Sequence, residues 1–151
     1  MASIRQATAE DIPRILELYD ELALVFSRAE EGRRPTLEEY ERTLERINAT
    51  PGLELLALEV NTEVAGLMEL LILPNLSHSA LPWAMIEGLI VDKRFRRRGF
   101  GKMLVEYAID RARKAGCYKL VLSSNKKRTE AHAFYRSLGF EDTGLAFRLN
   151  F

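Results

Sequence analysis

The sequence contains one cysteine, little histidine and no excess of charge of either sign. Cys117 is the single cysteine among 151 residues, so the chain cannot form an internal disulfide. His78 and His132 stand beside no carboxylate or thiol at ligand spacing, so we expect no metal site. Lys plus Arg and Asp plus Glu each number 22. This balance argues against nucleic acid or an anionic membrane as a partner of the whole surface.

Long hydrophobic runs are also absent. The longest stretch without Asp, Glu, Lys or Arg runs from Leu70 to Ile86 and contains two prolines, an asparagine and a histidine. It falls short of the ~20 apolar residues that a membrane span needs. The first residues lack the apolar core and cleavage pattern of a secretory signal, which predicts a cytoplasmic protein. The length suits one compact domain, and we expect a single domain over residues 1–151.

Two capping boxes predict where the first helices begin. Thr8 is followed three residues later by Asp11, and Thr36 is followed by Glu39. The second helix should end at Pro51-Gly52. Between the two helices, residues 30–35 read as a polar loop.

The remaining patterns predict strands and two further helices. Apolar residues recurring at helical spacing predict helices over Gly99–Ala115 and Thr129–Ser137. Runs rich in β-forming residues predict strands over Leu53–Val60, Val64–Leu73, Trp83–Asp92, Tyr118–Leu122 and Leu145–Phe151. With a short opening strand around Ile4, this order indicates a mixed α+β fold, in which a right-handed crossover allows one parallel strand pair.

A basic loop with two glycines joins a predicted strand to a predicted helix at residues 91–102. Glycine lets the backbone approach a ligand closely, and the unpaired N–H groups of a first helical turn attract anions. Cations in the loop would strengthen this attraction. We call residues Arg96–Lys102 the anion cradle. A solvated basic turn remains the alternative interpretation of this charge run.

Two common nucleotide motifs do not fit the anion cradle. A Walker A loop would need glycine at Arg96 and serine or threonine at Met103, and a dinucleotide fingerprint would need glycine or alanine at Leu104. The anion cradle is therefore expected to be neither a Walker A loop nor a dinucleotide-binding loop.

The chain resembles the GNAT superfamily of acyl-CoA-dependent N-acetyltransferases. The family signature Q/R-x-x-G-x-G/A stands here as Arg96-Arg-Arg-Gly-Phe-Gly101, and the segments Arg5–Asp11 and Ala131–Phe140 are similar too. The resemblance implies a GNAT fold, a mixed and mostly antiparallel central sheet that is splayed at the cofactor site and flanked by helices. It also implies acetyl-CoA as the acyl donor, with coenzyme A as product.

The resemblance assigns cofactor contacts to three parts of the chain. The signature loop would bind the coenzyme A pyrophosphate, and the strand before it would pair with the pantetheine arm. Many members carry asparagine at the position of Arg128, where a cation could instead meet a phosphate. By position, the expected cofactor-binding residues are Leu89, Ile90, Val91, Arg96, Arg97, Arg98, Gly99, Phe100, Gly101, Lys102 and Arg128.

Glu87 is the first candidate catalytic residue. Strand alternation predicts that it shares a face with Met85, Leu89 and Val91, where desolvation would make a carboxylate a better proton acceptor. The segment Ile86–Asp92 looks like a strand of amino-sugar-phosphate acetyltransferases, which favours the catalytic role. A structural glutamate paired with an arginine or a backbone amide is the alternative.

Tyr135 is the second candidate catalytic residue. Its ring lies on the apolar stripe of the predicted helix. In the family, the tyrosine of this F-Y-x-x-x-G-F pattern can give a proton to the departing thiolate.

Cys117 has no base nearby in sequence, so we expect a buried structural cysteine.

The sequence therefore predicts direct transfer of an acetyl group from acetyl-CoA to a primary amine in a ternary complex. A non-catalytic acyl-CoA-binding regulatory domain is one alternative, and a nucleic-acid-binding module built on the basic loop is another. The acceptor, a small molecule or a peptide, should be chosen by residues 22–36 and 74–82, which show no substrate signature. A homodimer is common among similar proteins.

Overall fold

The computed structural model describes residues 1–26, 34–124 and 126–151, and for residues 22–26 it describes the backbone alone. The expected polar loop at residues 30–35 thus lies mostly outside the described residues. The elements are, in order, β1 (Ala2–Gln6), η1 (Ala9–Asp11), α1 (Ile12–Phe26), α2 (Leu37–Ala49), β2 (Leu53–Val60), β3 (Glu63–Leu73), α3 (Ser77–Ala80), β4 (Trp83–Val91), η2 (Lys93–Phe95), α4 (Phe100–Lys114), β5 (Leu120–Leu122) and α5 (Thr129–Ser137).

The strands form one five-stranded sheet in the order β1-β2-β3-β4-β5. The first four strands pair antiparallel with their neighbours. Near the start of β4, the Tyr118 N–H donates to the Pro82 carbonyl and the Ala84 N–H to the Lys119 carbonyl, both at 3.0 Å. These contacts advance along both segments together, so β5 follows β4 in a parallel sense. The predicted α+β fold, mostly antiparallel and flanked by helices, is confirmed.

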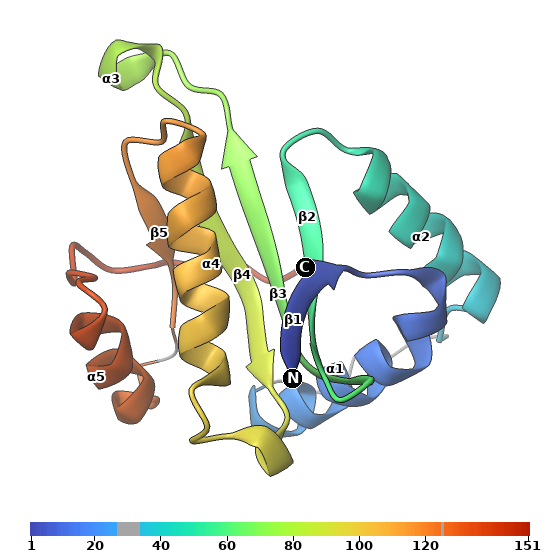
Figure 1. The fold of residues 1–151 in the computed structure, drawn as a ribbon. Coiled ribbons are helices and arrows are strands. Elements are labelled where there is room, and N and C mark those ends of the chain that lie inside the picture. The colour runs from blue at the N-terminus through green and yellow to red at the C-terminus, as the bar shows by residue number, and fades with distance from the viewer. Residues whose placement is uncertain (27–33, 125) are drawn as a thin grey trace. The chain divides into compact units, whose positions relative to one another are not determined.

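Helices cover both faces of the sheet in the unit Met1–Val121 (Figure 1). On one face, α1 and α2 pack on Ala57, Leu67 and Ile90 through an apolar cluster that includes Leu18 and Leu44. On the other face, α4 approaches so closely that a Cβ on Gly66 would lie 3.3 Å from the Leu104 side chain. The sheet is thus the middle layer of three, and its apolar residues form the core.

Local signals place the helix starts as the sequence predicts, and a tight turn joins the first hairpin. The Thr36 hydroxyl accepts from the Glu39 N–H at 3.2 Å, and the Glu39 carboxylate accepts from the Thr36 N–H at 2.6 Å. The same relation holds at Thr8, whose N–H donates to Asp11 at 2.8 Å. Between β2 and β3, Asn61 and Thr62 both have positive φ angles, as a tight hairpin turn requires.

The second unit, Leu122–Phe151, contains α5 and a C-terminal segment without regular structure. The predicted strand over Leu145–Phe151 is wrong: the described residues after α5 form no strand. Their alternating apolar side chains are exposed instead, those of Leu145, Phe147, Leu149 and Phe151. Alternation alone does not make a strand, because a strand also needs a partner for its backbone hydrogen bonds.

Candidate functional site

The anion cradle surrounds the N-terminus of α4. Gly99 is the residue before the helix, and its φ of 83° is a left-handed conformation that glycine adopts without strain. No side chain caps this end of α4. Since the first intrahelical bond here runs from the Met103 N–H to the Gly99 carbonyl at 3.0 Å, the N–H groups of Phe100, Gly101 and Lys102 have no acceptor within the helix. They are free to donate to an anion.

Cations and an aromatic ring flank these N–H groups. The side chains of Arg96, Arg97, Arg98 and Lys102 are exposed. The Arg98 guanidinium lies 5.7 Å from the centre of the Phe95 ring, and the Phe95 and Phe100 rings lie 6.3 Å apart. The Nε of Arg96 donates to the Val91 carbonyl at 2.9 Å, which closes the loop onto the end of β4. The predicted cofactor residues of this loop therefore lie around one helix N-terminus.

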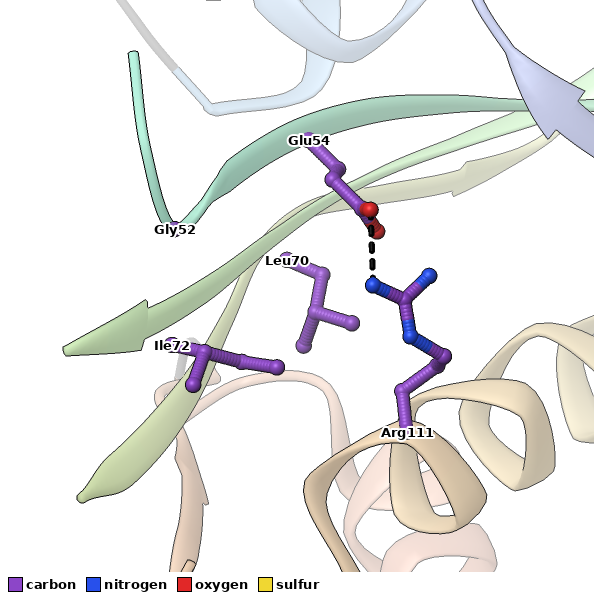
Figure 2. A pocket seen from close by; sticks show the side chains of 5 residues that line it. All are labelled: Gly52, Glu54, Leu70, Ile72 and Arg111. Atoms are coloured by element: carbon purple, nitrogen blue, oxygen red, sulfur yellow. Dashed lines mark hydrogen bonds and ion pairs between the residues drawn. The ribbon is translucent and has the colours of Figure 1, made fainter. Parts of the chain in front are cut away.

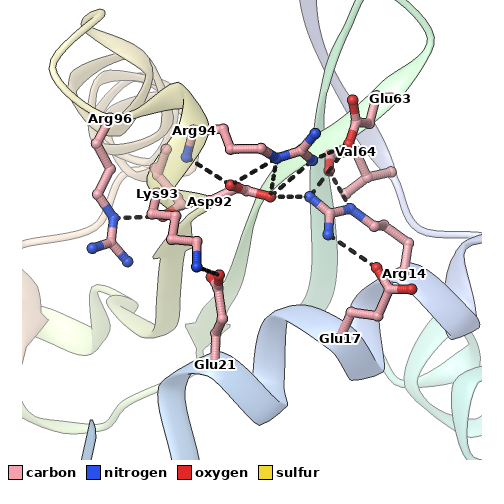
Figure 3. A network of polar contacts seen from close by, with 10 residues as sticks. Arg14, Glu17, Glu21, Glu63, Val64, Asp92, Lys93, Arg94 and Arg96 are labelled. Carbon is pink, nitrogen blue, oxygen red and sulfur yellow. Dashed lines mark hydrogen bonds and ion pairs between the residues drawn. The ribbon is translucent and has the colours of Figure 1, made fainter. Parts of the chain in front are cut away.

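A buried carboxylate, Asp92, holds the start of this loop in place (Figure 3). It accepts from the Arg94 N–H at 2.7 Å and forms ion pairs with Arg94 and with Arg14 of α1. Burial opposes its ionisation, but the hydrogen bonds from Arg94 and Arg14 outweigh it and hold the pKa of Asp92 well below its usual range. Arg14 also donates to the Val64 carbonyl at 3.0 Å. The network thus ties α1, β3 and the loop together.

A bulge in β4 changes the face on which Glu87 lies. Leu67 pairs with Ile90 and Glu69 with Glu87, so two steps along β3 match three steps along β4. Gly88, with a φ of 58°, stands in the extra position. Glu87 therefore shares the α1 and α2 face with Ile90, and the expected alternation of Glu87 with Leu89 and Val91 is wrong. A bulge shifts the side-chain period by one residue.

Glu87 is also exposed, so the apolar surroundings predicted for it are wrong. The desolvated carboxylate is instead that of Glu69, which lies directly opposite Glu87 on β3. Burial, and secondly the charge of Glu87, raise the pKa of Glu69. Burial together with Glu69 raises the pKa of Tyr19, on α1, to about 12.

The sequence reasoning did not select Glu69. The sequence does hold a feature that singles out Glu69, since it is the one charged residue inside the apolar run Val64–Leu73. It became informative only once the register placed Glu69 opposite Glu87.

Arg128 and Tyr135 belong to the second unit. Arg128 is the exposed residue before α5, and Tyr135 is buried within α5 between the rings of Phe134 and Phe140, whose centres lie 5.4 and 5.9 Å away. Burial raises the pKa of Tyr135, and Arg128 partly offsets this. The Tyr135 hydroxyl therefore stays protonated at neutral pH and is able to donate a proton.

A small hollow on the α4 face does not suit a large ligand (Figure 2). Its volume is about 100 Å³, and an ion pair between Arg111 and Glu54 at 2.7 Å lies across it. Ligand pockets usually hold several hundred cubic ångströms. The hollow is lined by Gly52, Glu54, Leu70, Ile72 and Arg111.

Other candidate features have structural roles or no ligand set. Burial raises the pKa of Cys117, which is half-buried, so the thiol is not activated. His78 stacks on Tyr118 with ring centres 3.9 Å apart. Among the described residues, no three His, Cys, Asp or Glu side chains gather as a metal site, and no described helix is long and apolar enough to cross a membrane.

Comparisons with known proteins agree with this geometry. The model of the acetyltransferase (GNAT) family matches residues 14–140. An uncharacterized N-acetyltransferase of Bacillus subtilis (strain 168), YhdJ, is 33% identical over 145 residues, which cover 95% of this chain and 92% of that protein. The glucosamine 6-phosphate N-acetyltransferase of Arabidopsis thaliana is 26% identical over 113 residues, which cover 73% of this chain and 74% of that one.

A solved structure shares the fold across the whole chain. The putative acetyltransferase from Agrobacterium tumefaciens str. C58 superposes with a TM-score of 0.86 and 33% identity, and the match covers 98% of this chain and 99% of that one.

Proposed function

Because the chain belongs to the GNAT family of acetyltransferases, we propose that it transfers an acetyl group from acetyl-CoA to a primary amine of a small molecule or peptide. Transfer is direct, with both substrates bound together. The observation that carries the proposal is the anion cradle, in which a left-handed Gly99 precedes uncapped helix N–H groups flanked by cations. We treat residues 1–151 as one domain for this activity, since the family match spans both units.

The cradle fits the pyrophosphate of coenzyme A by charge and by shape. The N–H groups of Phe100, Gly101 and Lys102 point along the helix axis toward the loop, and the helix dipole favours an anion there. Gly99 leaves open space, since a Cβ at this position would meet no atom within 4 Å. Arg97 and Arg98 add charge-assisted donors. In the second unit, Arg128 is assigned to a further phosphate contact.

The end of β4 provides the next contacts in the proposal. Within the described strands, the β3–β4 register assigns no partner to Gly88 or Leu89, because of the bulge. Backbone groups of Leu89, Ile90 and Val91 pair with the amide groups of the pantetheine arm. A backbone N–H near Leu89 polarises the thioester carbonyl and stabilises the developing oxyanion.

Two side chains carry out the proton transfers of the proposed reaction. An alkyl ammonium with a pKa of about 10.4 is mostly protonated at neutral pH and must lose a proton before its nitrogen can attack. The sequence proposes Glu87 for this role, directly or through a water. Tyr135, whose hydroxyl stays protonated at neutral pH because burial raises its pKa, protonates the departing sulfur.

Calorimetric titration with acetyl-CoA tests the proposal. We expect micromolar binding that weakens with dephosphorylated analogues and falls at least about tenfold in Arg98→Glu, as expected for loss of a charge-assisted contact. Arg113→Glu, an exposed arginine near the other end of α4, is the matched control and should retain binding. Absence of binding by the folded protein would overturn the proposal. Binding without turnover on a broad amine panel would indicate a regulatory acyl-CoA-binding domain.

A further inference from the structure

Two carboxylates face each other across neighbouring strands beside the β4 bulge. Glu69 of β3 and Glu87 of β4 are direct register partners. Like charges directly opposite in a sheet destabilise it. The pair lies two residues along β3 from Leu67, whose partner is Ile90, where α1 and α2 cover the same face of the sheet. The fold therefore keeps two repelling charges next to the strand end proposed to hold the thioester.

Other half-buried or buried acids of the sheet region are paired with arginine. Asp11 and Glu59 are bridged by Arg5, at 2.7 and 2.9 Å, and Asp92 is bridged by Arg14 and Arg94. In the part of the chain that the structure describes, neither the Glu69 nor the Glu87 carboxylate has a hydrogen-bond or ion-pair partner. The pair lacks the cation that its counterparts have.

Within residues 1–26, 34–124 and 126–151, the groups found to interact with the Glu69 carboxylate supply no positive charge. From α1, the group is the neutral phenol of Tyr19, and from β4 it is the carboxylate of Glu87. On β2 the register partner of Glu69 is Leu55, an apolar residue. Glu69 is half-buried while Glu87 is exposed, so the two carboxylates differ in solvation. The half-buried one holds a proton more readily than the exposed one.

We propose that Glu69, in place of the Glu87 suggested by the sequence, is the catalytic residue that takes the proton from the acceptor's ammonium group. Glu87 binds the same cation, and the acceptor is an aliphatic amine that arrives positively charged. This inference rests on the proposed function and names its acceptor class. The ammonium supplies the missing cation between the two carboxylates. Once Glu69 accepts a proton, the repulsion between the two carboxylates is relieved.

The proton balance is complete without another reactant. The ammonium gives one proton to the Glu69 carboxylate, which leaves a neutral amine with a free electron pair. Its nitrogen forms the bond to the thioester carbon as the carbon–sulfur bond breaks. The departing thiolate takes up one proton, the nitrogen gives up its second proton as the amide forms, which balances the first, and Glu69 releases its proton to solvent.

Kinetics as a function of pH test the assignment. The probes are n-butylamine, putrescine, glucosamine and a lysine-containing peptide, together with trifluoroethylamine, whose low basicity leaves it uncharged at neutral pH. Glu69→Gln should lower kcat by about 100-fold or more for the charged amines and much less for trifluoroethylamine, with acetyl-CoA affinity unchanged. Glu87→Gln should mainly raise KM for the charged amines. Glu54→Gln is a control from the opposite face of the sheet and should leave the pH profile unchanged.

A second readout does not depend on turnover. With coenzyme A bound, n-butylammonium should shift the titration of a ¹³C-labelled glutamate carboxyl whose signal is lost in Glu69→Gln. Acetylation that is insensitive to Glu69→Gln, or no shift of that signal, would overturn this inference and leave the proposed function standing. Failure of the wild-type protein to bind acetyl-CoA would instead remove the proposed function.

Discussion

Arg14 of α1 is ion-paired with Asp92, the residue directly before the loop that leads into the anion cradle. Arg94, two residues further on, is paired with the same carboxylate and with Glu63 at the start of β3. One buried carboxylate thus connects α1, on one face of the sheet, with the loop that leads into α4. Its removal should affect both stability and cofactor binding.

Asp92→Asn should lower the free energy of unfolding by about 3 kcal/mol at neutral pH, because it leaves two guanidinium groups without their shared partner. The pKa of Asp92 lies below its unfolded value, so its contribution is present above the unfolded value and is lost as the pH falls through the folded one. Urea denaturation of both proteins between pH 7 and pH 2 should show their stability difference shrinking in acid. A constant difference would contradict the assignment. Glu17→Gln, which removes an exposed partner of Arg14, is the control and should have little effect.

Glu69→Gln should stabilise the fold at neutral pH while it impairs activity. The folded pKa of Glu69 lies above the ordinary glutamate value, so its ionised form destabilises the native state above that pKa and has no such effect below the unfolded one. Thermal unfolding should therefore give a higher Tm for Glu69→Gln at pH 7 and the same Tm as wild type near pH 3. A lower Tm at pH 7 would identify Glu69 as a structural residue.

Gly99→Ala and Gly116→Ala form a matched pair at the two ends of α4. Both glycines have positive φ, 83° and 77°, and neither Cβ would meet an atom within 4 Å. Each substitution should cost about 1 kcal/mol of stability through backbone strain. Only Gly99→Ala should also weaken acetyl-CoA binding in calorimetry, because it alters the anion cradle. Equal loss of affinity in both variants would show that strain in the helix, rather than the cradle, controls binding.

Tyr135→Phe should lower kcat by about 10- to 100-fold while KM for acetyl-CoA changes little, because only the proton for the leaving thiolate is lost. The ring contacts with Phe134 and Phe140 remain. Tyr107→Phe is the control: its hydroxyl accepts from Arg111 at 3.1 Å on α4, away from the proposed chemistry. A Tyr135→Phe enzyme with full kcat would show that the thiolate leaves without this acid.

The sequence by itself determined where helices begin in this protein, because helix starts depend on residues that are close together in the chain. Thr36 and Glu39 cap one helix by hydrogen bonds that span three residues, and the glycines of the anion cradle mark the start of another. Such signals are readable because both partners lie within a few residues. The family signature is of the same kind, and it placed the proposed cofactor site on a strand, a loop and a helix N-terminus.

Tertiary structure decided which carboxylate is desolvated and which strands form. Periodicity assigned Glu87 to a buried face, but the bulge at Gly88 moved it, and pairing with β3 brought in Glu69, eighteen residues earlier in the chain. The C-terminal alternation from Leu145 to Phe151 lacks a pairing partner among the described residues and forms no strand. Register, bulges and desolvation arise from contacts between segments far apart in sequence, so they are decided only when the sheet assembles.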